Sequence, residues 1–183
     1  MIDMNYIEIE RDSIANGIGI RVVLWISGCS LHCKGCHNPE AWDIHSGYAF
    51  DESAKNELYE ALSKPYVKGI TFSGGHPLEP DNLSDVYSLI KDIKSKFPEK
   101  DIWLYTGYTL EYPRCFSLNT TLRRVTLRNR IIMNCDVVVD GEYIEELRDT
   151  TLPFRGSSNQ RLIDVKRTIE EKQIVLFEVN NGY

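Results

Sequence analysis

Three of the five cysteines stand together in one short segment of the sequence. Cys29, Cys33 and Cys36 form the pattern Cys-x-x-x-Cys-x-x-Cys, so a single loop can wrap all three thiolates around one inorganic centre. An ordinary 4Fe-4S cluster takes four cysteine ligands, and three would leave one iron with an open coordination position. A metal centre needs such a position to bind and transform a substrate. The pattern therefore predicts one reactive 4Fe-4S cluster per chain, held by these three cysteines.

The same thiols also fit a structural zinc site. Zinc in such sites takes four ligands in a tetrahedral arrangement, and His32, His37 or Cys135 is available as the fourth. The chain would then be a zinc-stabilised interaction module rather than an enzyme. Metal analysis after anaerobic purification separates the two alternatives, because iron with sulfide is readily distinguished from zinc.

A second candidate segment is the run Ser73-Gly-Gly-His-Pro77. A glycine pair lets the backbone approach a ligand that a Cβ atom would block. By itself a Gly-Gly turn is weak evidence for a binding site. It becomes more specific here because it follows a predicted strand and comes soon after the cysteines.

Four short apolar runs predict the strands that position these segments, and each run ends in a glycine-containing turn. The runs cover residues 21–26, 69–72, 101–105 and 136–140. The turns that follow them are Ser27-Gly28, Ser73-Gly74-Gly75, Thr106-Gly107 and Gly141. We read these as turn residues first, and as site residues only through their position at strand ends.

Helical periodicity separates these strands. Asp51 is a suitable N-cap for a helix with apolar residues at Ala54, Leu58 and Leu62, and Pro65 lies just beyond its end. A second amphipathic helix leads up to Pro98. A third is expected at about residues 122–133, within the segment 111–134, whose periodicity is harder to read. Strands that alternate with helices indicate an α/β fold with parallel strands, whose ligands gather at the carboxyl ends of those strands.

Length and composition limit the remaining choices. A chain of 183 residues with 42% hydrophobic content can bury one sizeable core, so we expect a single domain over residues 1–183. A net charge of -6 argues against nucleic acid as a partner. The local basic run, which we interpret as a solvated helix face, consists of Arg123, Arg124, Arg128 and Arg130.

The chain shows no signal peptide and no apolar stretch long enough to span a bilayer, so we expect a cytoplasmic protein without a membrane partner. Reduced thiols are the default in that compartment. Cys115 and Cys135 are interpreted as ordinary, mostly buried thiols.

The cysteine spacing and the glycine pair resemble those of radical S-adenosylmethionine (SAM) enzymes. The resemblance implies a partial (β/α) barrel and SAM as the second cofactor, with the SAM amino and carboxylate groups on the open iron. It implies no catalytic side chain beyond the cluster. The implied cofactor-binding residues are Gly35, Cys36, His37, Gly74 and Gly75. His76 is a departure, because the usual pattern has Glu or Asp after the glycines.

Within that superfamily the chain most resembles the activating enzymes of anaerobic ribonucleoside-triphosphate reductase. The resemblance covers about residues 16–165 and leaves a C-terminal extension at 166–183. It is carried by Asn16-Gly-Ile-Gly19, Cys36-His-Asn38, Trp42, Trp103-Leu-Tyr-Thr-Gly-Tyr108, Val139-Asp-Gly141, Leu147 and Phe154-Arg-Gly-Ser-Ser-Asn-Gln-Arg161.

This closer resemblance implies an oxidoreductase that abstracts a hydrogen from a glycine Cα in the large reductase subunit. It also implies an electron donor such as flavodoxin or ferredoxin. Candidate contacts with SAM or with the partner are Ser73, Thr106, Arg155 and Asn159. The open enzyme alternatives are an activator of another glycyl-radical protein and a small-molecule radical SAM enzyme. For the distal element at residues 154–161, a purely structural turn is an alternative of equal weight to a contact with SAM or the partner.

Overall fold

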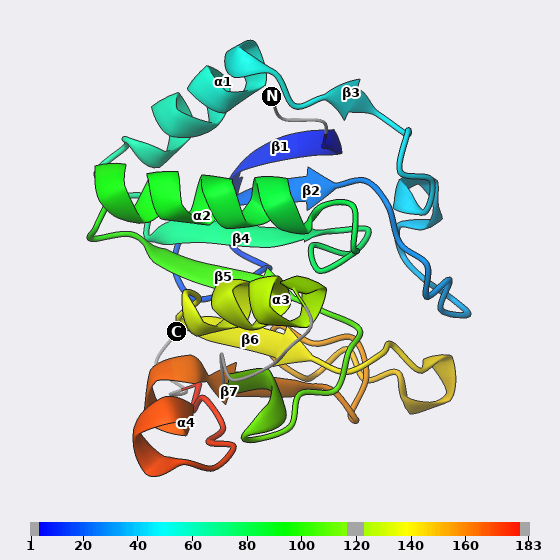
Figure 1. The fold of residues 1–183 in the computed structure, drawn as a ribbon. Coiled ribbons are helices and arrows are strands. Elements are labelled where there is room, and N and C mark those ends of the chain that lie inside the picture. Colours follow the sequence, from blue (N-terminus) through cyan, green and yellow to red (C-terminus); the bar gives the residue numbers. More distant parts are fainter. Residues whose placement is uncertain (1–3, 117–122, 180–183) are drawn as a thin grey trace.

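The protein is described by a computed structural model that covers residues 4–116 and 123–179. In this part of the chain, seven strands form one sheet with the order β3-β1-β2-β4-β5-β6-β7 (Figure 1). The strands are β1 (Asn5–Ser13), β2 (Arg21–Ile26), β3 (Tyr48–Ala49), β4 (Gly69–Gly74), β5 (Asp101–Tyr105), β6 (Val137–Asp140) and β7 (Arg161–Asp164).

The four central strands are parallel. β2 pairs with β4, β4 with β5 and β5 with β6, with Ile26 opposite Gly74 at the carboxyl ends of the first pair. β1, β3 and β7 add antiparallel pairs at the two edges. The carboxyl ends of the parallel strands share one edge of the sheet, where long loops gather (Figure 1). The central parallel strands confirm the predicted α/β class.

Three helices cover one face of this sheet: α1 (Glu52–Leu62), α2 (Leu83–Lys96) and α3 (Arg123–Met133) (Figure 1). The predicted cap of α1 is present, because Asp51 Oδ1 accepts a hydrogen bond from Ala54 N at 2.9 Å. The remaining helical elements are α4 (Val165–Glu171) and the short 3-10 turns η1 (Pro39–Ala41), η2 (Arg114–Phe116) and η3 (Glu145–Leu147).

Strand β5 shows how the sheet separates two cores. Successive side chains of a strand point to opposite faces. Ile102 and Leu104 join the large core under the helices. Trp103 belongs to a smaller cluster on the other face, where Phe154 and Phe177 pack against it. The extension after residue 165 therefore contributes to this second core through Phe177.

Some elements were not expected from the sequence. The strands β1, β3 and β7 and the helix α4 are additions to the predicted set. β1 carries charged residues between its apolar ones, and β3 is a two-residue pairing. The third helix begins at Arg123, and residue 122 of its predicted range lies outside the described residues. In the described ranges, none of the helices has the length and apolar character needed to cross a membrane.

Candidate active site

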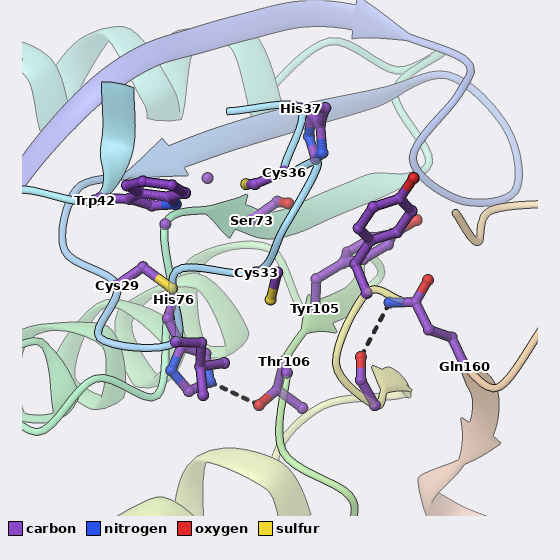
Figure 2. A pocket seen from close by; sticks show the side chains of 16 residues that line it. Cys29, Cys33, Cys36, His37, Trp42, Ser73, His76, Tyr105, Thr106 and Gln160 are labelled. Carbon is purple, nitrogen blue, oxygen red and sulfur yellow. Dashed lines mark hydrogen bonds between the residues drawn. The ribbon is translucent and has the colours of Figure 1, made fainter. Parts of the chain in front are cut away.

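A pocket lies at the carboxyl edge of the sheet, between the loops that follow the parallel strands (Figure 2). The segment after β2, residues 27–42, is called the cysteine loop below. The pocket is lined by Cys29, Leu31, Cys33, Cys36, His37, Trp42, Ser73, Gly74, Gly75, His76, Tyr105, Thr106, Gly107, Gly141, Tyr143 and Gln160. Four separate loops therefore meet around one space, as the parallel topology predicts.

The cysteine loop brings the three predicted thiols to this pocket (Figure 2). Its path is fixed by backbone hydrogen bonds, from Cys29 N to Trp42 O at 2.9 Å and from Cys36 N to Cys33 O at 3.1 Å. All three thiols are free and half-buried. In the described residues, no group of three His, Cys, Asp or Glu side chains is arranged to hold a single metal ion. Cysteine thiolates are the usual ligands of iron–sulfur clusters, so the chemistry of this donor set suits one.

Burial affects the thiols before any metal binds. Desolvation raises the pKa of Cys29, and desolvation with the nearby Glu142 raises the pKa of Cys33 to about 11. Both groups therefore favour the protonated thiol at neutral pH. A metal centre binds thiolates, so cluster assembly must supply the positive charge that removes these protons.

The glycine pair at the end of β4 lies where backbone segments pack closely together. Gly74 adopts a φ of 107°, a backbone angle that residues with a side chain rarely adopt. A Cβ added to Gly74 would collide with the backbone of Ile26, and one on Gly75 would collide with the carbonyl of Gly28. The glycines thus let the β4 turn pack directly on β2 and on the cysteine loop. Both glycines still line the pocket.

His76 is buried in the turn after the glycines, where its side chain is 1% exposed. Its Nε2 lies 2.8 Å from the hydroxyl of Thr106, in the loop after β5. Burial lowers the pKa of His76 to about 4, an effect that Arg128 reinforces and Glu79 opposes. The ring is therefore neutral at neutral pH, and it joins the loops after β4 and β5.

The distal element before β7 forms a hydrogen-bonded turn. Gln160 Oε1 accepts from Gly156 N at 2.9 Å and from Ser157 N at 3.2 Å, while Gln160 Nε2 donates to Gly141 O at 3.0 Å. Arg155 donates to Gln160 O and Asn159 donates to Glu142 O. Neither Arg155 nor Asn159 lines the pocket, whereas Gln160 does. These bonds support the structural alternative for Arg155 and Asn159.

Several candidates from the sequence meet at the pocket. Those that line it are Cys29, Cys33, Cys36, His37, Ser73, Gly74, Gly75 and Thr106. Gly35 does not line it; a Cβ there would instead approach the Glu145 side chain at 3.0 Å. His32 stacks on Trp42 with ring centroids 4.6 Å apart.

Sequence reasoning missed several pocket residues. Tyr105 and Gln160, which are labelled in Figure 2, line the pocket but were not predicted as site residues. The same holds for Tyr143 and Leu31. Tyr105 is the last residue of β5, so its position at a strand end was an available signal. Tyr143 and Gln160 come from loops whose paths the sequence pattern does not specify.

The cysteines outside the pattern lie away from the pocket. Cys135 is buried and its thiol donates to Ile131 O at 3.3 Å, and Cys115 is half-buried near α3.

The basic run in α3, which was predicted to be a solvated helix face, is only partly solvated. Arg130 is exposed, but the Arg128 guanidinium lies 4.4 Å from the Tyr108 ring centroid. The side chains of Arg123 and Arg124 lie outside the described set.

Comparison with known proteins identifies the family. The model of the 4Fe-4S single cluster domain matches residues 15–163. The chain is 39% identical over 159 residues to the anaerobic ribonucleoside-triphosphate reductase-activating protein of Enterobacteria phage T4, covering 87% of this chain and 93% of that protein. It is 36% identical over 159 residues to the proteins of the same name from Pasteurella multocida and Escherichia coli K12. Those matches cover 86% of this chain and 95% and 96% of the two relatives.

Three thiols at one pocket, the extent of the family match and the coverage of these relatives lead to the same conclusion. The chain contains a 4Fe-4S single cluster domain and belongs to the family of anaerobic ribonucleoside-triphosphate reductase-activating proteins.

Proposed function

We propose that this protein binds a 4Fe-4S cluster and SAM in the pocket at the carboxyl ends of β2, β4, β5 and β6, and generates a glycyl radical on a partner reductase. The observation that carries the proposal is the shared pocket of Cys29, Cys33 and Cys36, with the glycine turn of β4 beside them. The proposal includes a partial barrel of the radical SAM type, whose open side would admit the partner.

Different residues of the chain would bind the cluster and SAM in the pocket. Cys29, Cys33 and Cys36 would hold the cluster, which with bound SAM supplies a one-electron cleavage that gives methionine and a 5′-deoxyadenosyl radical. Gly74 and Gly75 would place backbone beside the methionine end of SAM. His37 would lie near the adenine. The electron would come from an outside donor such as flavodoxin or ferredoxin.

The walls of the pocket would limit side reactions. Tyr105 and Tyr143 bring aromatic surface to the pocket, and Gln160 lines it from the distal turn. An approaching partner loop would cover the remaining opening and exclude water, which protects a reactive radical. The hydrogen would pass from the partner glycine to the adenosyl carbon, leaving 5′-deoxyadenosine and a glycyl radical.

The relatives' names support the choice of partner, because they are reductase-activating proteins. We therefore propose the large subunit of the anaerobic ribonucleoside-triphosphate reductase as substrate. A cytoplasmic location suits both an oxygen-sensitive cluster and that partner. Cluster and SAM are the only cofactors that we propose.

Anaerobic turnover with and without the large subunit tests the proposal. With reductant and SAM alone, we expect slow or no SAM cleavage. Added large subunit should yield 5′-deoxyadenosine, methionine and a glycyl radical visible by electron paramagnetic resonance (EPR). Changing the target glycine to Ala should abolish the radical, because the added methyl group blocks approach.

Three other outcomes would contradict the proposal. Turnover of a small nucleoside precursor without a reductase radical would indicate a small-molecule radical SAM enzyme. A radical formed only on a different glycyl-radical protein would change the partner. Stoichiometric zinc without iron or sulfide after anaerobic purification would indicate an interaction module.

A further inference from the structure

Glu79 connects the two sides of the candidate site. It lies in the turn after the glycine pair, where its backbone N donates to His76 O at 2.9 Å. Its side chain is 15% exposed and reaches the cysteine loop. Glu79 Oε2 accepts from Ser30 N at 3.1 Å and from Ser30 Oγ at 3.0 Å. Ser30 directly follows Cys29, so a single carboxylate oxygen holds the chain next to a proposed cluster ligand.

The same carboxylate faces His76. Glu79 Oε2 lies 3.7 Å from His76 Nδ1, which is too long for a hydrogen bond but close for a charge beside a buried ring. The negative charge favours the tautomer with its proton on Nδ1. His76 Nε2 is then an acceptor for the Thr106 hydroxyl, which itself accepts from Tyr108 N at 3.1 Å.

A polar path therefore joins three loops, with a hydrogen bond at every step except the 3.7 Å electrostatic contact between His76 and Glu79. It runs from Tyr108 N–H through Thr106 and His76 to the Glu79 carboxylate, which also binds Ser30. These loops follow β5, β4 and β2, the strands that surround the pocket. Its only formal charge comes from Glu79, because His76 is neutral at neutral pH. Hydrogen bonds to a charged acceptor are stronger than neutral ones, so the two bonds from Ser30 to Glu79 are the strongest in the path.

We propose that Glu79 is a positioning residue, which fixes the cysteine loop against the glycine turn through Ser30 and so presets the spacing that SAM binding requires. This inference rests on the proposed function, since it assumes that SAM contacts both loops. A ligand that bridges two loops binds more tightly when their separation is already fixed. Loss of the carboxylate should weaken SAM binding more than it affects cluster assembly.

Glu79→Gln tests this inference in the anaerobically purified, cluster-containing protein. Gln keeps the size of the side chain and one acceptor oxygen but removes the charge. We expect iron and sulfide at the wild-type level, and a rise of about tenfold in the SAM dissociation constant, as expected for a weakened charge-assisted contact. The effect of SAM on the EPR spectrum of the reduced cluster should change as well.

Asp81→Asn is the matched control. Asp81 is exposed in the same loop and lines the outer hollow beside Cys29 together with Ser30 and Glu79. In the described residues, no hydrogen bond joins it to Ser30. Its loss removes the same charge without breaking the contact, so SAM affinity should stay within about twofold of wild type. An equal effect of the two variants would overturn the positioning role.

A double-mutant cycle tests whether Glu79 affects SAM binding through Ser30. Ser30→Ala should weaken SAM binding by a smaller factor, because its backbone N still donates to Glu79. If Glu79 acts through Ser30, the double variant should bind SAM more tightly than the product of the two single effects predicts. Strict additivity would overturn the inference. If Glu79→Gln fails to fold, wild-type affinity in Ser30→Ala would also overturn it.

Measurements on the wild-type protein separate a failure of this inference from a failure of the proposed function on which it rests. No SAM-dependent change in the wild-type EPR spectrum would contradict the proposed function itself. A normal wild-type response, together with unchanged affinity in Glu79→Gln, would contradict only the role of Glu79.

Discussion

His76 Nε2 lies 2.8 Å from the hydroxyl of Thr106, which ties the turn after β4 to the loop after β5. The contact is buried at both ends, since the two residues are 1% and 5% exposed. A buried, neutral imidazole in this position is a fixed part of the pocket wall. Its protonation would leave a poorly solvated charge, a cost that Arg128 increases and Glu79 only partly offsets.

The first prediction concerns the pH dependence of stability. The pKa of His76 is about 4 in the folded protein, below the value of about 6.5 for an unperturbed histidine, so the unfolded chain binds the proton more tightly. The contribution of neutral His76 is complete above about pH 6.5 and is lost as the pH falls toward 4. Between about pH 7 and pH 5 the loss is about 2 kcal/mol.

His76→Asn removes this titration and keeps a polar side chain near Thr106. Denaturant unfolding of the two anaerobically purified proteins at both pH values measures the difference. All other ionisable groups are shared, so the comparison isolates His76. Equal losses of stability in wild type and variant would show that His76 is not buried in its neutral form.

The second prediction assigns the cluster ligands. Ala at Cys29, Cys33 or Cys36 should abolish the air-sensitive brown cluster, because all three thiols line the pocket. Ala at Cys115 or Cys135 should leave the cluster in place. Iron and sulfide analysis of the five variants decides the assignment. A normal cluster in Cys33→Ala would rule out Cys33 as a ligand.

The third prediction concerns the β4 turn. Gly74→Ala should destabilise the protein by about 2 kcal/mol or more, because it combines a left-handed φ with a collision against backbone. Gly107→Ala is the control: its Cβ would meet the end of the Leu31 side chain, which can move. Thermal unfolding should show the larger loss for Gly74→Ala. Similar losses would mean that the β4 turn can shift to admit a methyl group.

The fourth prediction concerns the distal turn. Gln160→Ala removes the acceptor for Gly156 N and Ser157 N and the donor to Gly141 O. Unfolding stability should fall by about 1 to 3 kcal/mol, and the glycyl-radical yield should fall while iron and sulfide remain normal. Gln173→Ala, at an exposed position in the tail, should change neither quantity. An unaffected radical yield in Gln160→Ala would make the turn irrelevant to activation.

Local sequence signals were sufficient to predict the cluster chemistry, helix α1 and the four central strands. The cysteine spacing indicated the chemistry of a 4Fe-4S domain, which the family match confirms. Asp51 and the apolar periodicity after it predicted α1, and the four central strands were found from their apolar runs. These features depend on neighbours within a few residues, where backbone and side-chain preferences act directly.

Only the tertiary structure decided which distant residues meet. Glu79 and Ser30 are far apart in sequence, and their contact depends on the packing of the β4 turn against the cysteine loop. The glycine pair was visible in the sequence, but the close packing of Gly74 on Ile26 and of Gly75 on the Gly28 carbonyl depends on the tertiary structure. Gln160 reaches the pocket because β7 pairs antiparallel with β6. Such contacts form when non-local strands pair, and no short sequence pattern encodes that pairing.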